Sequence, residues 1–121
     1  TLGHYLTACA QAYLTAPNES DRTWMKNRVQ TLIDGLLECQ NSTSGRGYQP
    51  GFVFGTIIND ANNKEYQFDV VEGKINGSHW VPWYNMHKLL TGINAAYNYV
   101  GYEPAKTLGI QPCKQMESEY P

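Results

Sequence analysis

Apolar side chains in residues 2–40 recur three and four positions apart, the spacing that lines one face of an α-helix. The first stripe consists of Leu2, Tyr5, Leu6, Cys9, Ala12, Tyr13 and Ala16. Pro17 and Asn18 then interrupt it, because proline lacks a backbone N–H and disfavours helix for the residue before it. The second stripe consists of Trp24, Met25, Arg28, Val29, Leu32, Ile33, Leu36 and Leu37. The pattern predicts a helical hairpin over residues 2–40, with two antiparallel helices.

The helical period stops in residues 41–79, where glycines, prolines and a polar cluster at residues 59–63 punctuate the chain. Residues 52–58 and 66–71 are rich in aromatic and β-branched side chains, and are predicted to pair as a short β-hairpin. A loop excursion of this length is usually functional or disordered, and its aromatic content argues against disorder. We therefore expect it to cover a site.

A third helix is predicted over residues 82–100. Pro82 stands at a first-turn position, where its missing N–H costs nothing, and Gly101 follows the last periodic residue. Two neighbouring sides of this helix are partly apolar, as in a helix buried within a barrel. Residues 110–121 show no period, so an irregular tail is expected there.

Composition excludes two classes of partner. The chain has 121 residues, a formal net charge of -2 and no cluster of Lys or Arg. It therefore lacks a positively charged surface that would bind nucleic acids or anionic membranes. No apolar run approaches the roughly 20 residues that a membrane-spanning helix needs. The chain begins at Thr1 without Met and without a residue that would cap the first helix, from which we expect processing, trimming or fragmentation.

Cys9, Cys39 and Cys113 are odd in number and have no metal-knuckle spacing. We expect Cys9 and Cys39 to be buried free thiols within helices. Three glycan acceptor triplets lie in predicted turns and favour a secreted glycoprotein. Their asparagines are Asn18, Asn41 and Asn76.

His4 and His87 each fall in the first turns of a predicted helix. Unpaired amides at a helix start favour polar ligands and a neutral imidazole, which donates one hydrogen bond and accepts another, as hydroxyl-rich ligands require. Trp80, Trp83 and Tyr84 add a platform for the C–H faces of sugar rings. The competing interpretation is a core histidine bonded to a backbone carbonyl, with Trp83 filling the core.

The sequence contains no Gly-x-Ser-x-Gly, no His-Glu-x-x-His and no phosphate-binding loop, which sets aside those enzyme classes. Asp60, Glu65, Asp69 and Glu72 are candidate general acids in the excursion, but their spacing implies no pairing. No catalytic residue and no metal ligand is assigned from the sequence.

Four strings resemble the beta-L-arabinofuranosidase-like glycoside hydrolases of families 127 and 146, in order and in approximate spacing. They are Leu2-Gly3-His4-Tyr5-Leu6-Thr7-Ala8, Leu36-Leu37-Glu38-Cys39-Gln40, Gly47-Tyr48, and the run from Trp80 to Gly92. The first and last strings are the specific ones. The resemblance implies a mainly α fold in which residues 1–109 form part of an (alpha/alpha)6 barrel, with His4 and His87 lining the sugar pocket.

The family's zinc-bound cysteine nucleophile and its glutamates match nothing here, and the stretch around Cys113 does not resemble their motifs. The resemblance therefore implies a fragment that contributes sugar-pocket residues for arabinofuranoside-type glycans. Its partners would be carbohydrate and the rest of the barrel, with zinc held outside this chain and no hydrolysis by the chain alone. The alternatives are a non-catalytic carbohydrate-binding or structural protein that keeps the helical barrel, and a small helical interaction module.

Overall fold

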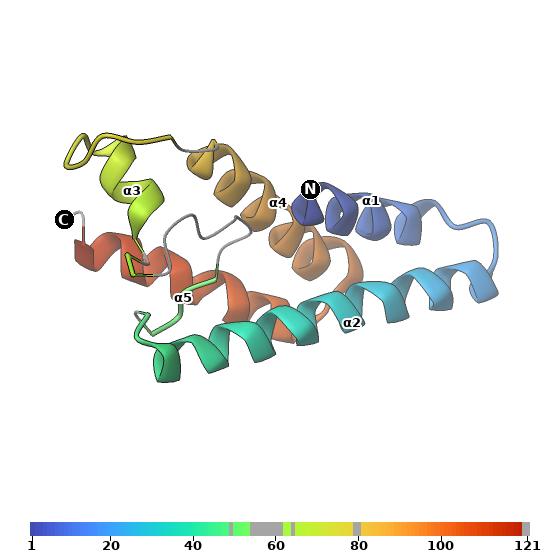
Figure 1. Cartoon of the computed structure of the whole chain (residues 1–121). Helices are drawn as coiled ribbons and strands as arrows, with labels where there is room; N and C mark the ends of the chain where they lie inside the picture. Colours follow the sequence, from blue (N-terminus) through green and yellow to red (C-terminus); the bar gives the residue numbers. More distant parts are fainter. Residues whose placement is uncertain (49, 54–61, 64, 79–80, 120–121) are drawn as a thin grey trace.

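The computed structural model describes residues 1–48, 50–53, 62–63, 65–78 and 81–119 (Figure 1). These residues form five α-helices and a short 3-10 helix, without a strand. The elements are α1 (Leu2–Thr15), α2 (Glu19–Thr43), η1 (Ser44–Arg46), α3 (Tyr66–Val71), α4 (Pro82–Val100) and α5 (Glu103–Glu119). The fold is mainly α, as the sequence predicts.

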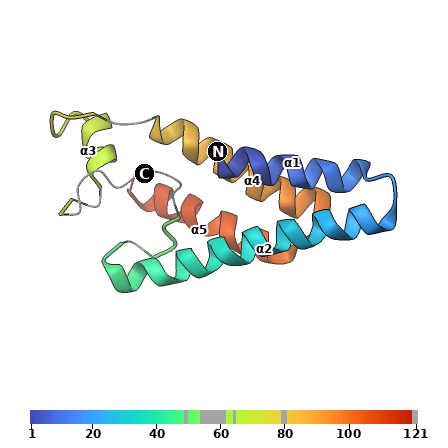
Figure 2. The ribbon, with the colours of Figure 1, turned by 45° about the vertical axis from the view of Figure 1, so that its right-hand side comes forward.

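Side-chain caps set the starts of α1 and α2. The Thr1 hydroxyl accepts from the His4 backbone N–H, so the helix that seemed uncapped in the sequence is capped by the first residue itself. Asn18 Oδ1 accepts from the Asp21 N–H at 2.8 Å and opens α2 directly after Pro17. Each cap satisfies an amide that has no partner inside its helix. The two helices fold back on each other as a hairpin, as Figure 2 shows.

Two predictions of local structure are wrong. Residues 66–71 form α3 rather than a strand, because the Glu65 N–H donates to Asn63 Oδ1 at 3.0 Å and starts a helical turn. Short apolar runs do not distinguish strand from buried helix by period alone. The partner run, residues 52–58, lies outside the described residues from position 54 onward. The expected irregular tail is helical through Glu119, despite Pro112.

Two contacts to α2 anchor α5. Proline at position 112 has no N–H for the carbonyl four residues earlier, that of Leu108. The Gln40 side chain replaces that donor: its Nε2 donates to Leu108 O at 3.3 Å and to Gly51 O at 2.8 Å. Just before α5, the Tyr102 hydroxyl donates to the Asp34 carboxylate, and this hydrogen bond raises the pKa of Tyr102 above its ordinary value of 10.0.

Two glycines govern how α1 packs on α4. A Cβ at Gly3 would lie 2.2 Å from the Lys88 carbonyl oxygen, and a Cβ at Gly92 would lie 2.6 Å from the Gly3 carbonyl oxygen. The backbones therefore approach as closely as only glycine permits. Gly3 faces Lys88 and Leu6 faces Gly92, so the helices run in parallel, and the first turns of α4 extend beyond the start of α1 (Figure 1).

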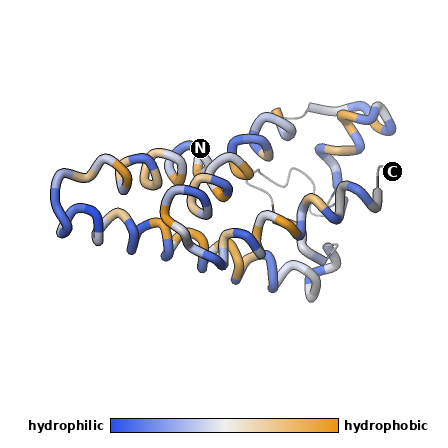
Figure 3. The backbone as a smooth tube through the Cα atoms, turned by 180° about the vertical axis from the view of Figure 1, so that it is seen from behind, coloured by the Kyte–Doolittle hydropathy of each residue, from blue (hydrophilic) through white to orange (hydrophobic). Residues whose placement is uncertain are grey.

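A hydrophobic core formed by residues of four helices extends from this contact. In Figure 3, hydrophobic and hydrophilic residues alternate along the helices. Its buried members are Leu6, Cys9, Ala10, Val29, Ile33, Val53, Leu89, Ile93, Ala95, Ala96, Val100, Ala105 and Leu108. Cys9 is a buried free thiol, as expected, but Cys39 is exposed, because the neighbouring Gln40 takes the inward position. Tyr5 and Trp24 lie on the predicted stripes yet are 46% and 52% exposed. The buried face of α1 is therefore narrower than the predicted stripe, and it runs through Gly3 and Leu6.

Replacing Gly3 with Ala should lower the free energy of unfolding by about 1–3 kcal/mol, because the methyl group meets a backbone carbonyl that cannot rotate away. Gly35→Ala is the matched control. Nothing lies within 4 Å of a Cβ there, so removing a helix-interior glycine should raise stability by about 0.5–1 kcal/mol. Urea denaturation measures both. Equal effects would contradict the packing assigned to Gly3.

Gln40→Met should also destabilise the protein, because it leaves two carbonyl groups without their donor. We expect the free energy of unfolding to fall by about 1–3 kcal/mol, the cost of leaving a buried polar group without a partner. Pro112→Ala supplies a backbone N–H for the Leu108 carbonyl. In that background we expect Gln40→Met to cost measurably less, a coupling that a double-mutant cycle reports. An identical cost in both backgrounds would show that Gln40 does not compensate for the proline.

Candidate functional site

The candidate site lies where the start of α1 meets the first two turns of α4. The close contact between Gly3 and Lys88 brings the next residue of α1, His4, beside Tyr84. Their ring centroids are 6.1 Å apart and the planes are inclined by 50°. His4 is exposed, and Tyr84 keeps 47% of its surface accessible. Two residues that the sequence places far apart thus border one open surface.

Thr1 fixes the orientation of the His4 ring. Its Oγ1 lies 2.8 Å from Nδ1 of His4, in addition to accepting the backbone N–H of the same residue at 3.4 Å. Nδ1 is therefore occupied, and Nε2 is the ring nitrogen that remains available to a ligand. The capping residue of α1 and the candidate ligand-binding residue are thus one structural unit.

Lys88 completes the group from the second turn of α4. Its ammonium nitrogen lies 5.2 Å from the centroid of the Tyr84 ring, in the range of a cation–π contact. We refer to His4, Tyr84 and Lys88 as the His4–Tyr84–Lys88 cluster. It combines an imidazole, an aromatic face and a positive charge, which are groups that bind hydroxyl-rich ligands by hydrogen bonds and by stacking. Lys88 was not singled out in the sequence, although the four-residue spacing from Tyr84 places both on one helix face.

Trp83 faces a different neighbour. It makes an edge-to-face contact with Phe68 of α3, with centroids 5.5 Å apart, and remains 46% exposed. Trp83 therefore neither fills the core nor stacks with Tyr84. His87 is exposed, and its carbonyl oxygen accepts from the Thr91 hydroxyl at 2.8 Å. Trp80, the third member of the predicted platform, lies outside the described residues.

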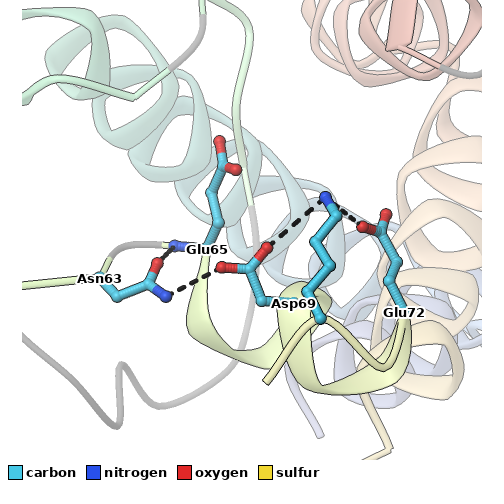
Figure 4. Close-up of polar contacts among 5 residues, drawn as sticks. Asn63, Glu65, Asp69 and Glu72 are labelled. Carbon is cyan, nitrogen blue, oxygen red and sulfur yellow. Dashed lines mark hydrogen bonds and ion pairs between the residues drawn. The ribbon is translucent and has the colours of Figure 1, made fainter.

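The carboxylates of the excursion hold α3 together, as Figure 4 shows. Asn63 Nδ2 donates to Asp69 Oδ2 at 2.9 Å, and the Lys74 ammonium pairs with Asp69 at 3.7 Å and with Glu72 at 2.5 Å. Glu65 stands at the start of α3. These contacts give Asp69 and Glu72 structural partners, and Asp60 lies outside the described residues.

The three glycan acceptor residues lie in different environments. Asn18 Nδ2 donates to Asp21 Oδ2 at 2.9 Å as part of the α2 cap. Asn41 lies in the last turn of α2, so its predicted position in a turn is wrong. Asn76 is exposed in the non-helical segment between α3 and α4.

Cys9 is buried on α1, whereas Cys39 and Cys113 are exposed on α2 and α5. Within the part of the chain that the structure describes, no three His, Cys, Asp or Glu side chains gather closely enough to hold a metal ion. The described residues therefore do not fit a thiolate zinc centre, and the sequence resemblance implies that residues outside this chain bind the zinc.

Comparison with models of protein families matches residues 1–113 to the catalytic domain of beta-L-arabinofuranosidase of family GH127. The match includes every residue of the His4–Tyr84–Lys88 cluster, and it confirms the resemblance drawn from the sequence motifs. No curated protein and no solved structure gives a significant match. Among the described helices, none combines the length and apolar character needed to cross a membrane.

We expect Thr1→Val to remove the hydrogen bond that orients the His4 ring, and Thr1→Ser to keep that hydrogen bond. Valine removes the cap, which should cost about 0.5–2 kcal/mol of stability, and leaves Nδ1 without its partner. When the Thr1 hydroxyl donates its proton to Nδ1, the imidazole tautomer that carries its proton on Nε2 is favoured. Nitrogen NMR of the imidazole should report this form in the native protein and in the serine variant, and a mixture in the valine variant. An unchanged ring in all three would contradict the role of Thr1.

Proposed function

Because this chain belongs to the GH127 beta-L-arabinofuranosidase catalytic-domain family, we propose that its His4–Tyr84–Lys88 cluster forms part of a pocket for arabinofuranoside-type glycans. The observation that carries the proposal is the juxtaposition of the His4 and Tyr84 rings at an exposed edge. A furanose ring presents C–H groups on one face and hydroxyl groups at its rim. These features match an aromatic face beside an imidazole N–H.

Each member of the cluster has a distinct part in the proposed binding. Tyr84 offers its accessible ring face to the sugar, and His4 donates from Nε2 to a hydroxyl or ring oxygen. The Lys88 ammonium lies over the same tyrosine ring and adds further hydrogen-bond donors for the sugar hydroxyls. His87 and Trp83, both exposed on the first two turns of α4, are proposed as flanking contacts for a longer glycan.

We assign binding, and no bond-breaking step, to these residues. The described donors do not fit a zinc centre, and the described carboxylates Asp69 and Glu72 are paired with Lys74. Beside the cluster, α1 exposes Leu2 and Tyr5, 40% and 46% accessible. We propose that further helices of the barrel cover this apolar side and supply the remaining walls of the pocket.

We also propose that the protein is secreted and glycosylated. This proposal is supported by three acceptor triplets, of which Asn76 combines an exposed side chain with a non-helical backbone. The Asn18 amide is engaged in the α2 cap, and Asn41 is held in a helix. We therefore propose Asn76 as the preferred acceptor when the protein passes through a secretory pathway.

Tyr84→Ala should weaken binding of methyl beta-L-arabinofuranoside by about 0.5–1.5 kcal/mol, the range for one packed aromatic face. Tyr99→Ala is the matched control, since it removes a tyrosine of similar exposure, 43% against 47%, from the far end of the same helix. Isothermal titration calorimetry of the native protein and both variants measures the difference. Absence of binding by the native protein, or equal losses in both variants, would contradict the proposed site.

The same calorimetric titration can test the two histidines. His4→Ala should cost about 1–3 kcal/mol of binding free energy, because it strands a polar partner of the bound sugar. We expect the same direction for His87→Ala. If His87→Ala leaves both affinity and stability unchanged while His4→Ala does not, the pocket is confined to the His4 side of α4. Binding without release of arabinose by the native protein would favour the non-catalytic alternative.

A further inference from the structure

Asn76 and Gly77 stand at an exposed turn of the chain between α3 and α4. Residues 76–78 have no regular secondary structure and lie in the connection between α3 and α4 (Figure 1). All three residues are exposed. The segment follows Gly73, whose φ of 72° reverses the chain directly after α3. No helical hydrogen-bond ladder therefore holds the backbone between the Asn76 side chain and the following amide.

Gly77 packs closely against two side chains of α3. A Cβ there would lie 2.2 Å from the Tyr66 hydroxyl and 3.0 Å from a methyl carbon of Val70. A larger residue at position 77 would have to displace these two side chains. A residue without a side chain thus fits closely against α3, directly after an exposed asparagine.

This combination favours an intramolecular reaction. The Gly77 backbone nitrogen, after losing its proton, attacks Cγ of Asn76, and a C–N bond forms as ammonia leaves with the side-chain nitrogen. The product is a five-membered succinimide. Water then adds to either carbonyl and breaks one of the two C–N bonds, which gives aspartate or isoaspartate. Glycine after asparagine accelerates the attack, because no side chain hinders the approach and the backbone turns freely.

We propose that Asn76 is a site of spontaneous deamidation that converts this turn to aspartate and isoaspartate. Five other asparagines provide an internal comparison, since each lies within a helix and precedes a residue with a side chain. They are Asn27, Asn41, Asn85, Asn94 and Asn98. Their backbones are fixed in the helical conformation, away from the geometry that cyclisation requires.

The modification also has a structural consequence. Isoaspartate adds one methylene to the backbone directly before Gly77, the residue that packs on Tyr66 and Val70. Because α3 rests on α4 through the Phe68–Trp83 contact, loosening this turn should loosen α3 at the edge of the candidate site. The chemistry itself requires no sugar and does not depend on the proposed function.

The test is incubation of the protein, produced in a host that does not glycosylate, at mildly alkaline and mildly acidic pH. Peptide mapping by mass spectrometry should show loss of the Asn76 amide while Asn27 and Asn94 stay intact, with faster loss at the higher pH. In heavy-oxygen water the product should gain one heavy oxygen atom, which marks opening of a succinimide. An isoaspartate-specific methyltransferase should label the aged protein.

Asn76→Gln keeps Gly77 and its packing, and should abolish both the labelling and the mass change at this turn. Limited proteolysis then compares aged native protein with aged Asn76→Gln protein, and we expect faster cleavage near α3 only in the former. A synthetic peptide of residues 72–81 serves as the unfolded reference. If the peptide deamidates while Asn76 in the folded protein persists, the fold protects the turn and the proposal is overturned.

Discussion

The contact between the backbones of Gly3 and Gly92 sets the geometry on which the rest of this structure depends. Each glycine faces backbone atoms of the other helix, so α1 and α4 lie closer together than any side chain at these positions would allow. Small residues further along the two helices, Ala10 on α1 and Ala96 on α4, are both fully buried. The parallel arrangement brings the start of α1 against the first two turns of α4, where His4 meets Tyr84. The candidate site is thus a consequence of close helix packing.

A second constraint lets α5 complete the core. Pro112 would normally end or bend a helix, because it leaves the carbonyl one turn earlier without a donor. Gln40 supplies that donor from α2. Its side chain can be buried because its amide group donates to two backbone carbonyl oxygens, those of Gly51 and Leu108. One amide side chain therefore holds α5 against α2 and also fixes the loop at Gly51. This long-range contact explains why the sequence indicated an irregular tail where the chain is helical.

The predictions succeeded where the signal is local. The 3.6-residue period, Pro17 and Gly101 located α1, α2 and α4 within a few residues, since caps and periodicity act over single turns. They failed for α3, where six residues that alternate between apolar and polar side chains are ambiguous until Asn63 is recognised as the residue that starts the turn. His4 and Tyr84 were each identified, but their proximity was not. It depends on Gly3, whose role appears only when a second helix is placed beside it.

The division between Trp83 and Tyr84 shows how helix geometry limits a sugar platform. Successive residues of an α-helix point about 100° apart, so adjacent aromatic rings on α4 cannot share one flat surface. Tyr84 turns toward α1 and meets His4, whereas Trp83 turns toward α3 and meets Phe68. The two rings therefore border the first turns of α4 on two different sides. A glycan that touches both must cross the helix start, where His87 lies between the two directions one turn further along.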